Sequence, residues 1–576
     1  MTDSTASPDN SAAGETILGH PKGLFVLFFT EMWERFSYYG MRGLLIVYLT
    51  QHFLFSDEKS SVIYGAYTAL VYVMTIIGGS LADRYLGARK AVTFGAILLV
   101  LGHFGMAFEG NGSKQLMSYQ GQDYQIALDA RGGDAKQEII SASGRSYVSF
   151  TDDTIELAEP QAVGLPEIID RSDVSMRVER ESMYVNILYL SLALIIAGVG
   201  FLKANISTIV GALYGFGDSR RDSGFTIFYM GINLGAFSAS ILCGWLGISY
   251  GWKYGFGLAG IGMVAGLVIF LWKQSLLEGR AEPPSLEKLS EKVFGPINYE
   301  WMCYLIGVGI IAVSMFLVMN EELVGGILLP IGIGMFAFFV FYAFTKLEGD
   351  ERSRMLAALY FTLAQIPFWA LFEQAGSSLN LFTTRLVDRE IFGLSVPGPV
   401  FQSLNAGFIF LFAPIMAWLW IALAKKNLNP SSPVKFAIGV ALAGLGFLAL
   451  VAGMKSSGEI GFTPVIFIFL IYWIHTMGEL FVSPVGLSVV TKLAPVRIVG
   501  MTMGAWFLYS GLSNFLAGVI ARTTGAETIG GQMTNVAAAK AGYVDVYSNV
   551  GYTALGIALV MLIISPVIKK MMRGAE

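Results

Sequence analysis

Cysteine is almost absent from this chain: Cys243 and Cys303 are the only two in 576 residues. Both lie in apolar stretches, so we expect them to pack rather than to form a disulfide framework. Charged residues are also scarce, at 14% of the chain against 54% hydrophobic residues. A chain this long and this apolar cannot bury its hydrophobic side chains in one soluble core. The composition therefore predicts a helical protein that crosses a membrane many times.

Several motifs are missing as well. Residues 1–20 are polar and lack the basic start and apolar middle of a signal peptide, so we expect the tail 1–21 to stay in the cytoplasm. There is no Gly-x-x-x-x-Gly-Lys-Ser/Thr loop for a nucleotide, and no His-Glu-x-x-His or Gly-x-Ser-x-Gly arrangement of a membrane enzyme. The sequence thus predicts a non-enzyme without metal, cofactor or nucleic-acid partner. The energy for its work would come from an ion gradient.

Apolar runs long enough to cross a hydrocarbon core of about 30 Å recur along the whole chain. Fourteen candidates can be counted: 22–53, 61–83, 90–108, 184–213, 223–249, 253–274, 300–319, 324–345, 355–387, 399–424, 434–454, 462–490, 497–521 and 547–568. Lys and Arg are concentrated in alternate short loops, such as 84–90 and 425–435, and at the C-terminal end. Because basic loops stay on the cytoplasmic side, both termini are predicted to be cytoplasmic.

Two segments interrupt this array. Residues 109–182 form a polar insertion on the predicted outer side, with 14 acidic against 7 basic residues. Alternation on either side of Asp152-Asp153 predicts a small β-hairpin within it. We favour a small, partly β periplasmic subdomain without chemistry, and a partner-binding module is the alternative. The second segment is a polar linker, 276–298, before two segments at 299–346 that contain almost no ionisable residue.

The first apolar segment contains an unusual concentration of charge. Glu31, Glu34, Arg35, Tyr38 and Arg42 fall on one stripe of roughly 100° if the segment is helical. Buried charges cost several kcal/mol each unless they are paired or meet water, so this face predicts a functional site inside the membrane. A solvated face of a soluble helix, or a structural ion pair between helices, would explain the same pattern.

Sequence motifs now point to a family. The loop 79–90 resembles the signature loop of the major facilitator superfamily, and the run Glu31 to Gly40 resembles the Glu-x-x-Glu-Arg-Phe-x-Tyr-Tyr-Gly motif of the proton-dependent oligopeptide transporter (POT/PTR) family without a substitution. Further matches lie at 225–235, 368–382, 401–405 and 478–495. The resemblance covers nearly every segment except 1–20 and 109–182.

The resemblance implies an all-α integral membrane protein with the major facilitator fold. We expect an N-terminal six-helix bundle at 22–275, an inserted two-helix hairpin at 299–346 and a C-terminal six-helix bundle at 354–570. The substrate would bind at the midplane between the bundles. The protein would be a multi-pass protein of the bacterial inner membrane, sufficient as a monomer. In such a family the signature loop implies a cytoplasmic gate made of Asp83, Arg84, Arg89 and Lys90.

A site for many peptides must hold the termini and the backbone, because the side chains vary. The resemblance places Arg42 and Lys203 at the peptide carboxylate and Glu479 at its ammonium, although Ala204 stands where the family usually has Pro. The other residues expected to bind substrate are polar or aromatic: Asn233, Asn405, Ser483, Tyr38, Tyr39, Tyr72, Trp369 and Trp506.

Coupling to protons requires carboxylates that exchange partners. Our hypothesis has one cluster made of Glu31, Glu34, Arg35 and Lys203, and a second in which Glu373 pairs with Arg42. Protonation of Glu373 would then release Arg42 to bind the peptide carboxylate. The predicted function is proton-coupled import of di- and tripeptides by alternating access. The alternatives are a transporter of another solute, such as nitrate or a metabolite conjugate, and a peptide sensor without transport.

Overall fold

The computed structural model describes residues 16–129, 136–215 and 218–574, so the predicted tail 1–21 is described only from Thr16. Within these residues, thirteen helical stretches are long and apolar enough to cross a membrane. Helix α1 (Lys22–Gln51) is long enough as well, at 30 residues, but it carries the charged face. The prediction of a multi-pass helical membrane protein with fourteen spanning segments is confirmed.

Six long helices form an N-terminal bundle in which α3 packs on α5, and α1 on α6 and α7. Their bounds are α1 (Lys22–Gln51), α2 (Asp57–Leu81), α3 (Ala88–Met106), α5 (Ser182–Ala212), α6 (Arg221–Tyr250) and α7 (Trp252–Lys273). Glycines allow the close crossings: a Cβ at Gly235 of α6 would collide with the backbone of Met32 in α1, and one at Gly78 of α2 with Gly200 of α5. Helix α1 is therefore packed tightly in its own bundle, and most of its charged face is buried.

A second bundle follows, in which α14 packs on α15 and α17, and α11 on α15 and α16. Its helices are α11 (Gly349–Phe372), α12 (Ser378–Leu386), α13 (Ser403–Lys425), α14 (Ser432–Ser456), α15 (Ile466–Leu493), α16 (Val499–Arg522) and α17 (Val536–Met571). The run predicted as one segment at 355–387 is interrupted. A 3-10 turn, Glu373–Gly376, separates α11 from α12, and Tyr64 of α2 packs against Gly376 where no Cβ could fit.

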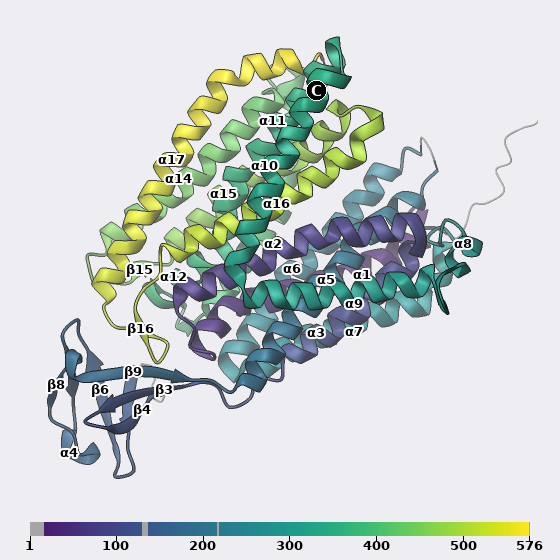
Figure 1. Cartoon of the computed structure of the whole chain (residues 1–576). Helices are drawn as coiled ribbons and strands as arrows, with labels where there is room; N and C mark the ends of the chain where they lie inside the picture. Colours follow the sequence, from purple (N-terminus) through teal and green to yellow (C-terminus); the bar gives the residue numbers. More distant parts are fainter. Residues whose placement is uncertain (1–15, 130–135, 216–217, 575–576) are drawn as a thin grey trace, which may run out of the picture.

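In the chain, the two bundles are separated by α9 (Tyr299–Met319) and α10 (Glu321–Lys346), which follow the short helix α8 (Leu286–Ser290). Helix α9 packs mainly on α5, whereas α10 packs on α16 and α11, and both contact α2. Each helix of the inserted pair therefore accompanies a different bundle. The two bundles meet near the strands and diverge toward the end of the molecule that carries α8 and the C-terminus (Figure 1).

The polar insertion folds as one antiparallel sheet, which we call the β domain (Lys114–Glu179). The strand order is β8-β7-β6-β5-β4-β3-β9. The strands are β3 (Lys114–Tyr119), β4 (Gln122–Asp129), β5 (Lys136–Ile140), β6 (Arg145–Phe150), β7 (Thr154–Leu157), β8 (Ile168–Asp170) and β9 (Val174–Glu179), with helix α4 (Pro160–Val163) after β7. The predicted hairpin is confirmed, because Val148 pairs with Leu157 and Phe150 with Ile155.

Five two-stranded ladders complete the described structure. They are β1 (Thr16–Ile17) with β2 (His20–Pro21), β10 (Lys292–Phe294) with β11 (Ile297–Asn298), β12 (Val387–Asp388) with β15 (Thr463–Pro464), β13 (Glu390–Ile391) with β14 (Leu394–Ser395), and β16 (Thr528–Ile529) with β17 (Gln532–Met533). The last of these joins α16 to α17 and lies next to the β domain (Figure 1). We refer to this side of the molecule as the β-domain side, and to the side of α8 as the terminal side.

Candidate functional site

The charged face of α1 forms a buried cluster. Arg35 Nε lies 3.1 Å from Glu31 Oε1, and the same guanidinium is ion-paired with Glu34. The three side chains are at most 5% exposed. Lys203 lies on the neighbouring helix α5, and its Nζ is 4.2 Å from the centre of the Tyr72 ring of α2. The structure thus brings together the residues of the first hypothesised cluster.

The second hypothesised pair joins the two bundles. Arg42 of α1 is ion-paired with Glu373 in the turn that interrupts the α11–α12 segment, and its Nε donates to Tyr64 Oη at 2.7 Å. The turn is fixed by Gln374, which donates to Ala517 O in α16 at 2.9 Å. The interruption of the helix therefore places the Glu373 carboxylate against the N-terminal bundle.

A third polar group belongs to the C-terminal bundle alone. Asn405 of α13 donates to Glu479 Oε2 of α15 at 2.8 Å and to Thr476 Oγ1 at 3.1 Å. Ser483 lies one turn beyond Glu479 on the same helix. Opposite, Asn233 of α6 donates to the Tyr229 carbonyl oxygen at 3.0 Å, and its side chain borders the space between the bundles.

All three groups border one cavity of about 370 Å³ between the bundles. This volume is in the range of small-molecule sites, about 300–1,000 Å³. On the N-terminal bundle, three cations, Arg35, Arg42 and Lys203, line the cavity together with one carboxylate, Glu31. On the C-terminal bundle the charged lining residues are Glu373 and Glu479. The cavity is therefore electrostatically polarised, and it suits a ligand with a negative and a positive end.

A second cavity, of about 890 Å³, continues the first because both are lined by Tyr229, Glu479 and Ser483. It runs between α6, α13 and α15 to Arg221 at the start of α6 and Thr491 near the end of α15. Both of these residues lie toward the terminal side, so that side gives access to the site.

A sequence model of the POT family matches residues 89–536. The chain belongs to the POT family. Among its relatives, the peptide transporter YePEPT of Yersinia enterocolitica is 33% identical and aligns over 89% of each chain. The uncharacterised transporter YclF of Bacillus subtilis is also 33% identical, over 99% of each. The crystal structure of a peptide transporter POT in complex with sulfate superposes with a TM-score of 0.73, at 32% identity and 97% coverage of both chains.

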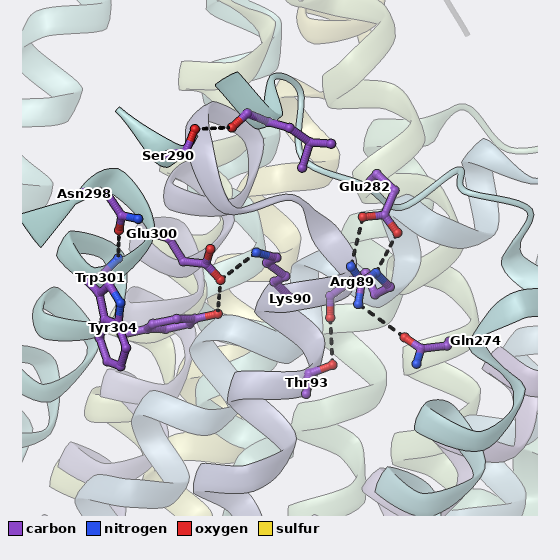
Figure 2. A network of polar contacts seen from close by, with 11 residues as sticks. Arg89, Lys90, Thr93, Gln274, Glu282, Ser290, Asn298, Glu300, Trp301 and Tyr304 are labelled. Carbon is purple, nitrogen blue, oxygen red and sulfur yellow. Dashed lines mark hydrogen bonds and ion pairs between the residues drawn. The ribbon is translucent and has the colours of Figure 1, made fainter. Parts of the chain in front are cut away.

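In this POT family member, the residues of the predicted gate lie on the terminal side. Asp83 and Arg84 are exposed, in a π-helical turn after α2. Arg89 contacts Glu282 at 2.6 and 2.9 Å and donates to Gln274 at 3.2 Å (Figure 2). Lys90 contacts Glu300 of α9 at 2.6 Å (Figure 2).

These contacts attach the first turn of α3 to the linker before α9 and to the start of α9 itself. Beside Arg89, the pKa of Glu282 falls below its ordinary value, so the linker pair stays ionised. None of these partners comes from the C-terminal bundle, which fits a terminal side that is open.

The predicted aromatic residues divide into two groups. Tyr39 and Tyr72 line the cavity. Tyr38 packs beside Tyr39 under the Arg35 guanidinium. Trp369 makes edge-to-face contacts with Phe368 and Phe372, and Trp506 lies in the hydrophobic core of the C-terminal bundle. In this arrangement these last three do not border the cavity, and their role in binding stays a prediction.

Several residues that line the cavity were not predicted from the sequence: Ser207, Tyr229, Gln402 and Tyr472. They carry no charge and stand as single polar residues among apolar ones. Their positions in the sequence therefore form no pattern that would predict a binding site. Tyr64, whose hydroxyl fixes the Arg42 guanidinium, was not predicted either.

The β-domain side is closed by an ion pair that spans the bundles and was not predicted. Arg385 of α12 contacts Asp57 of α2 through two bonds of 2.6 and 2.9 Å, with the side chains 6% and 1% exposed. Asp57 also accepts the Ala526 N–H, at 3.1 Å. An acidic residue is common in the first turn of a helix, because its negative charge interacts favourably with the helix dipole. The sequence therefore offers no reason to predict that Asp57 contacts the other bundle.

We expect Asp57→Asn to loosen this closure, because a neutral amide makes weaker hydrogen bonds to Arg385 than a carboxylate does. A cysteine at Ser61, which is fully buried where α2 crosses Gly518 of α16, can report the opening. In a chain whose own two cysteines are replaced by alanine, we expect maleimide to label Ser61→Cys about three to ten times faster in the Asp57→Asn variant.

The control is Asp123→Asn, which breaks an exposed pair with Arg177 inside the β domain. Equal labelling rates in Asp57→Asn and the parent chain would show that the ion pair does not hold this side closed.

Proposed function

We propose that this protein is a proton-coupled symporter that imports di- and tripeptides by alternating access. The polarised cavity carries the proposal: the excess of cations on the N-terminal bundle and the two carboxylates on the C-terminal bundle match the two ends of a peptide. The relative YePEPT, which is named a peptide transporter, supports the same substrate class. The protein would work as a monomer in the bacterial inner membrane, use a proton gradient and need no cofactor.

Peptide recognition follows from the positions of the charges. Arg42 and Lys203 would bind the peptide carboxylate, and Glu479 would accept the ammonium in place of the Asn405 amide that it now contacts. The amides of Asn233 and Asn405 can both donate to and accept from the peptide backbone. Tyr39 and Tyr72 offer apolar area to variable side chains.

Proton coupling would use the pair that joins the bundles. While Glu373 is ionised, it holds the Arg42 guanidinium and competes with the peptide carboxylate. A proton on Glu373 removes this competition, so proton and peptide would bind together. The cluster of Glu31, Glu34, Arg35 and Lys203 would respond in the same way, since Lys203 lies within reach of both that cluster and the cavity.

The orientation follows from the basic loops. The positive-inside rule places the terminal side, with Arg89, Lys90 and the C-terminal Lys569, in the cytoplasm, and the β domain outside. With its outer side closed by Asp57 and Arg385 and its cavity reached from the terminal side, the structure would represent the inward-facing state. Transport would alternate between this state and one in which the outer ends of the bundles separate.

Counterflow separates the candidate functions. Proteoliposomes loaded with unlabelled dialanine should take up labelled dialanine by exchange without any gradient, and unlabelled tripeptides outside should compete. Competition by nitrate or by a glycosylated metabolite, without competition by peptides, would favour the alternative solutes. Binding of dialanine without exchange would show a sensor rather than a transporter.

A further inference from the structure

The β domain is inserted in the N-terminal bundle, between α3 and α5, yet it contacts the hairpin that joins α16 to α17 in the C-terminal bundle (Figure 1). We propose that the β domain is a strap that holds the outer ends of the two bundles together and releases the hairpin β16–β17 when the outer side opens. This proposal rests on the alternating-access function proposed above. Its evidence is a set of contacts at both ends of the domain.

At the first end, both connections of the domain are attached to the turn between α1 and α2. Arg180, after β9, donates to the carbonyl oxygens of Phe53 and Leu54 at 2.7 and 2.6 Å. Before β3, the Ser113 N–H donates to His52 O at 2.9 Å, and the His52 ring bonds the Glu109 carbonyl oxygen at 2.7 Å. The domain is therefore fixed to the N-terminal bundle rather than suspended on free linkers.

At the second end, the sheet holds the hairpin of the C-terminal bundle. Ile529 of β16 is 3% exposed and belongs to the hydrophobic core of the β domain, where it packs with residues such as Ile126 and Ile139. Gln137 of β5 donates to the Ile529 carbonyl oxygen. An apolar side chain of one bundle thus completes the core of a domain that belongs to the other.

Polar contacts flank this apolar one. Arg171 contacts Glu527 at 2.6 and 3.3 Å, and Asn535 donates to both carboxylate oxygens of Asp152 at 3.1 and 3.0 Å. Arg171 lowers the pKa of Glu527 below its ordinary value. Because a lowered pKa keeps the carboxylate charged at mildly acidic pH, an acidic outer solution would leave the pair intact.

Separation of the outer ends must break one set of attachments. The contacts to the hairpin are the set that can separate, since they are non-covalent and their ion pair is exposed, with Glu527 57% exposed, whereas the chain itself joins the β domain to α3 and α5. The attachment to the turn between α1 and α2 instead uses main-chain groups and the Arg180 guanidinium stacked on Phe55, 4.7 Å from the ring centre. The strap would therefore release at the hairpin and remain on the N-terminal bundle.

The first test compares opening rates with the Ser61→Cys labelling assay in nanodiscs, without any transported substrate. We expect Arg171→Ala/Glu527→Ala to raise the labelling rate about two- to fivefold, and Ile529→Ser to raise it further. The reversed pair Arg171→Glu/Glu527→Arg should restore the parent rate. The matched control is Asp123→Ala/Arg177→Ala, an exposed ion pair wholly inside the β domain, which should change nothing. Unchanged rates in all hairpin variants would overturn the proposal.

A crosslink provides the second test. Cysteines at Asp152 and Asn535, whose side chains are in contact, can be joined by a short bismaleimide in the same cysteine-free chain. We expect the crosslinked protein to lose dialanine uptake at least about tenfold and to keep Ser61→Cys protected, while Asp152→Cys alone with the reagent behaves like the parent. Full uptake by the crosslinked protein would show that the domain does not restrain the bundles. If the parent itself transports no peptide, the proposed function fails, whereas the labelling rates still decide whether the strap exists.

Discussion

Glu373→Gln should destroy the ability of the protein to concentrate dialanine while leaving exchange intact. The amide imitates the protonated carboxyl group, so Arg42 is released for the peptide but no proton is carried at this position. Each coupled proton supports about tenfold accumulation per pH unit of gradient, because 1.4 kcal/mol is a factor of ten. With a gradient of about two pH units, loss of this proton lowers the steady accumulation about 100-fold.

The experiment compares gradient-driven uptake and counterflow in the same proteoliposomes. The matched control is Glu390→Gln, which neutralises an exposed carboxylate a short distance beyond α12. Retained counterflow shows that Glu373→Gln folds and binds peptide. If the variant still accumulates dialanine as the parent does, Glu373 is not a coupling residue.

Glu479→Gln should weaken binding of free peptides by at least about 30-fold, since removal of one partner from a desolvated charge pair costs about 2–5 kcal/mol. The physical reason is that Glu479 faces the cavity and, among the residues that the structure describes, has no cation paired with it. A peptide ammonium would supply that cation.

An N-acetylated dialanine distinguishes this role from a structural one. The parent should prefer dialanine over the acetylated peptide, and Glu479→Gln should lose the preference rather than weaken both peptides equally. Glu459→Gln, an exposed carboxylate between α14 and α15, is the control for loss of negative charge. An undiminished preference for the free ammonium in Glu479→Gln would remove this residue from the binding site.

Much of the fold could be predicted from the sequence, because the signals are local. Apolar runs of about 20 residues indicate spanning segments whatever their neighbours are. The helical stripe of Glu31, Glu34 and Arg35 indicated a buried charged cluster, and the structure places these residues together. Val148, Phe150 and their partners also alternate locally, so the hairpin β6–β7 could be predicted.

The rest depends on contacts between residues far apart in the chain. Asp57 and Arg385 are separated by 328 positions, and neither is unusual in its own segment. The break after Phe372 in the run 355–387 was not predicted either, since it is fixed by contacts with Tyr64 and Ala517 from other helices. In the same way, nothing in Ile529 indicates that it completes the core of the β domain.

Proton-coupled peptide transport is tested most directly by the accumulation of labelled dialanine in proteoliposomes under an inward proton gradient. We expect the dialanine concentration inside to rise above the concentration outside, and a protonophore to collapse this accumulation. We also expect that no ATP is needed. Uptake that only equilibrates dialanine, with the same final level when the gradient is present or absent, would contradict proton-coupled peptide transport.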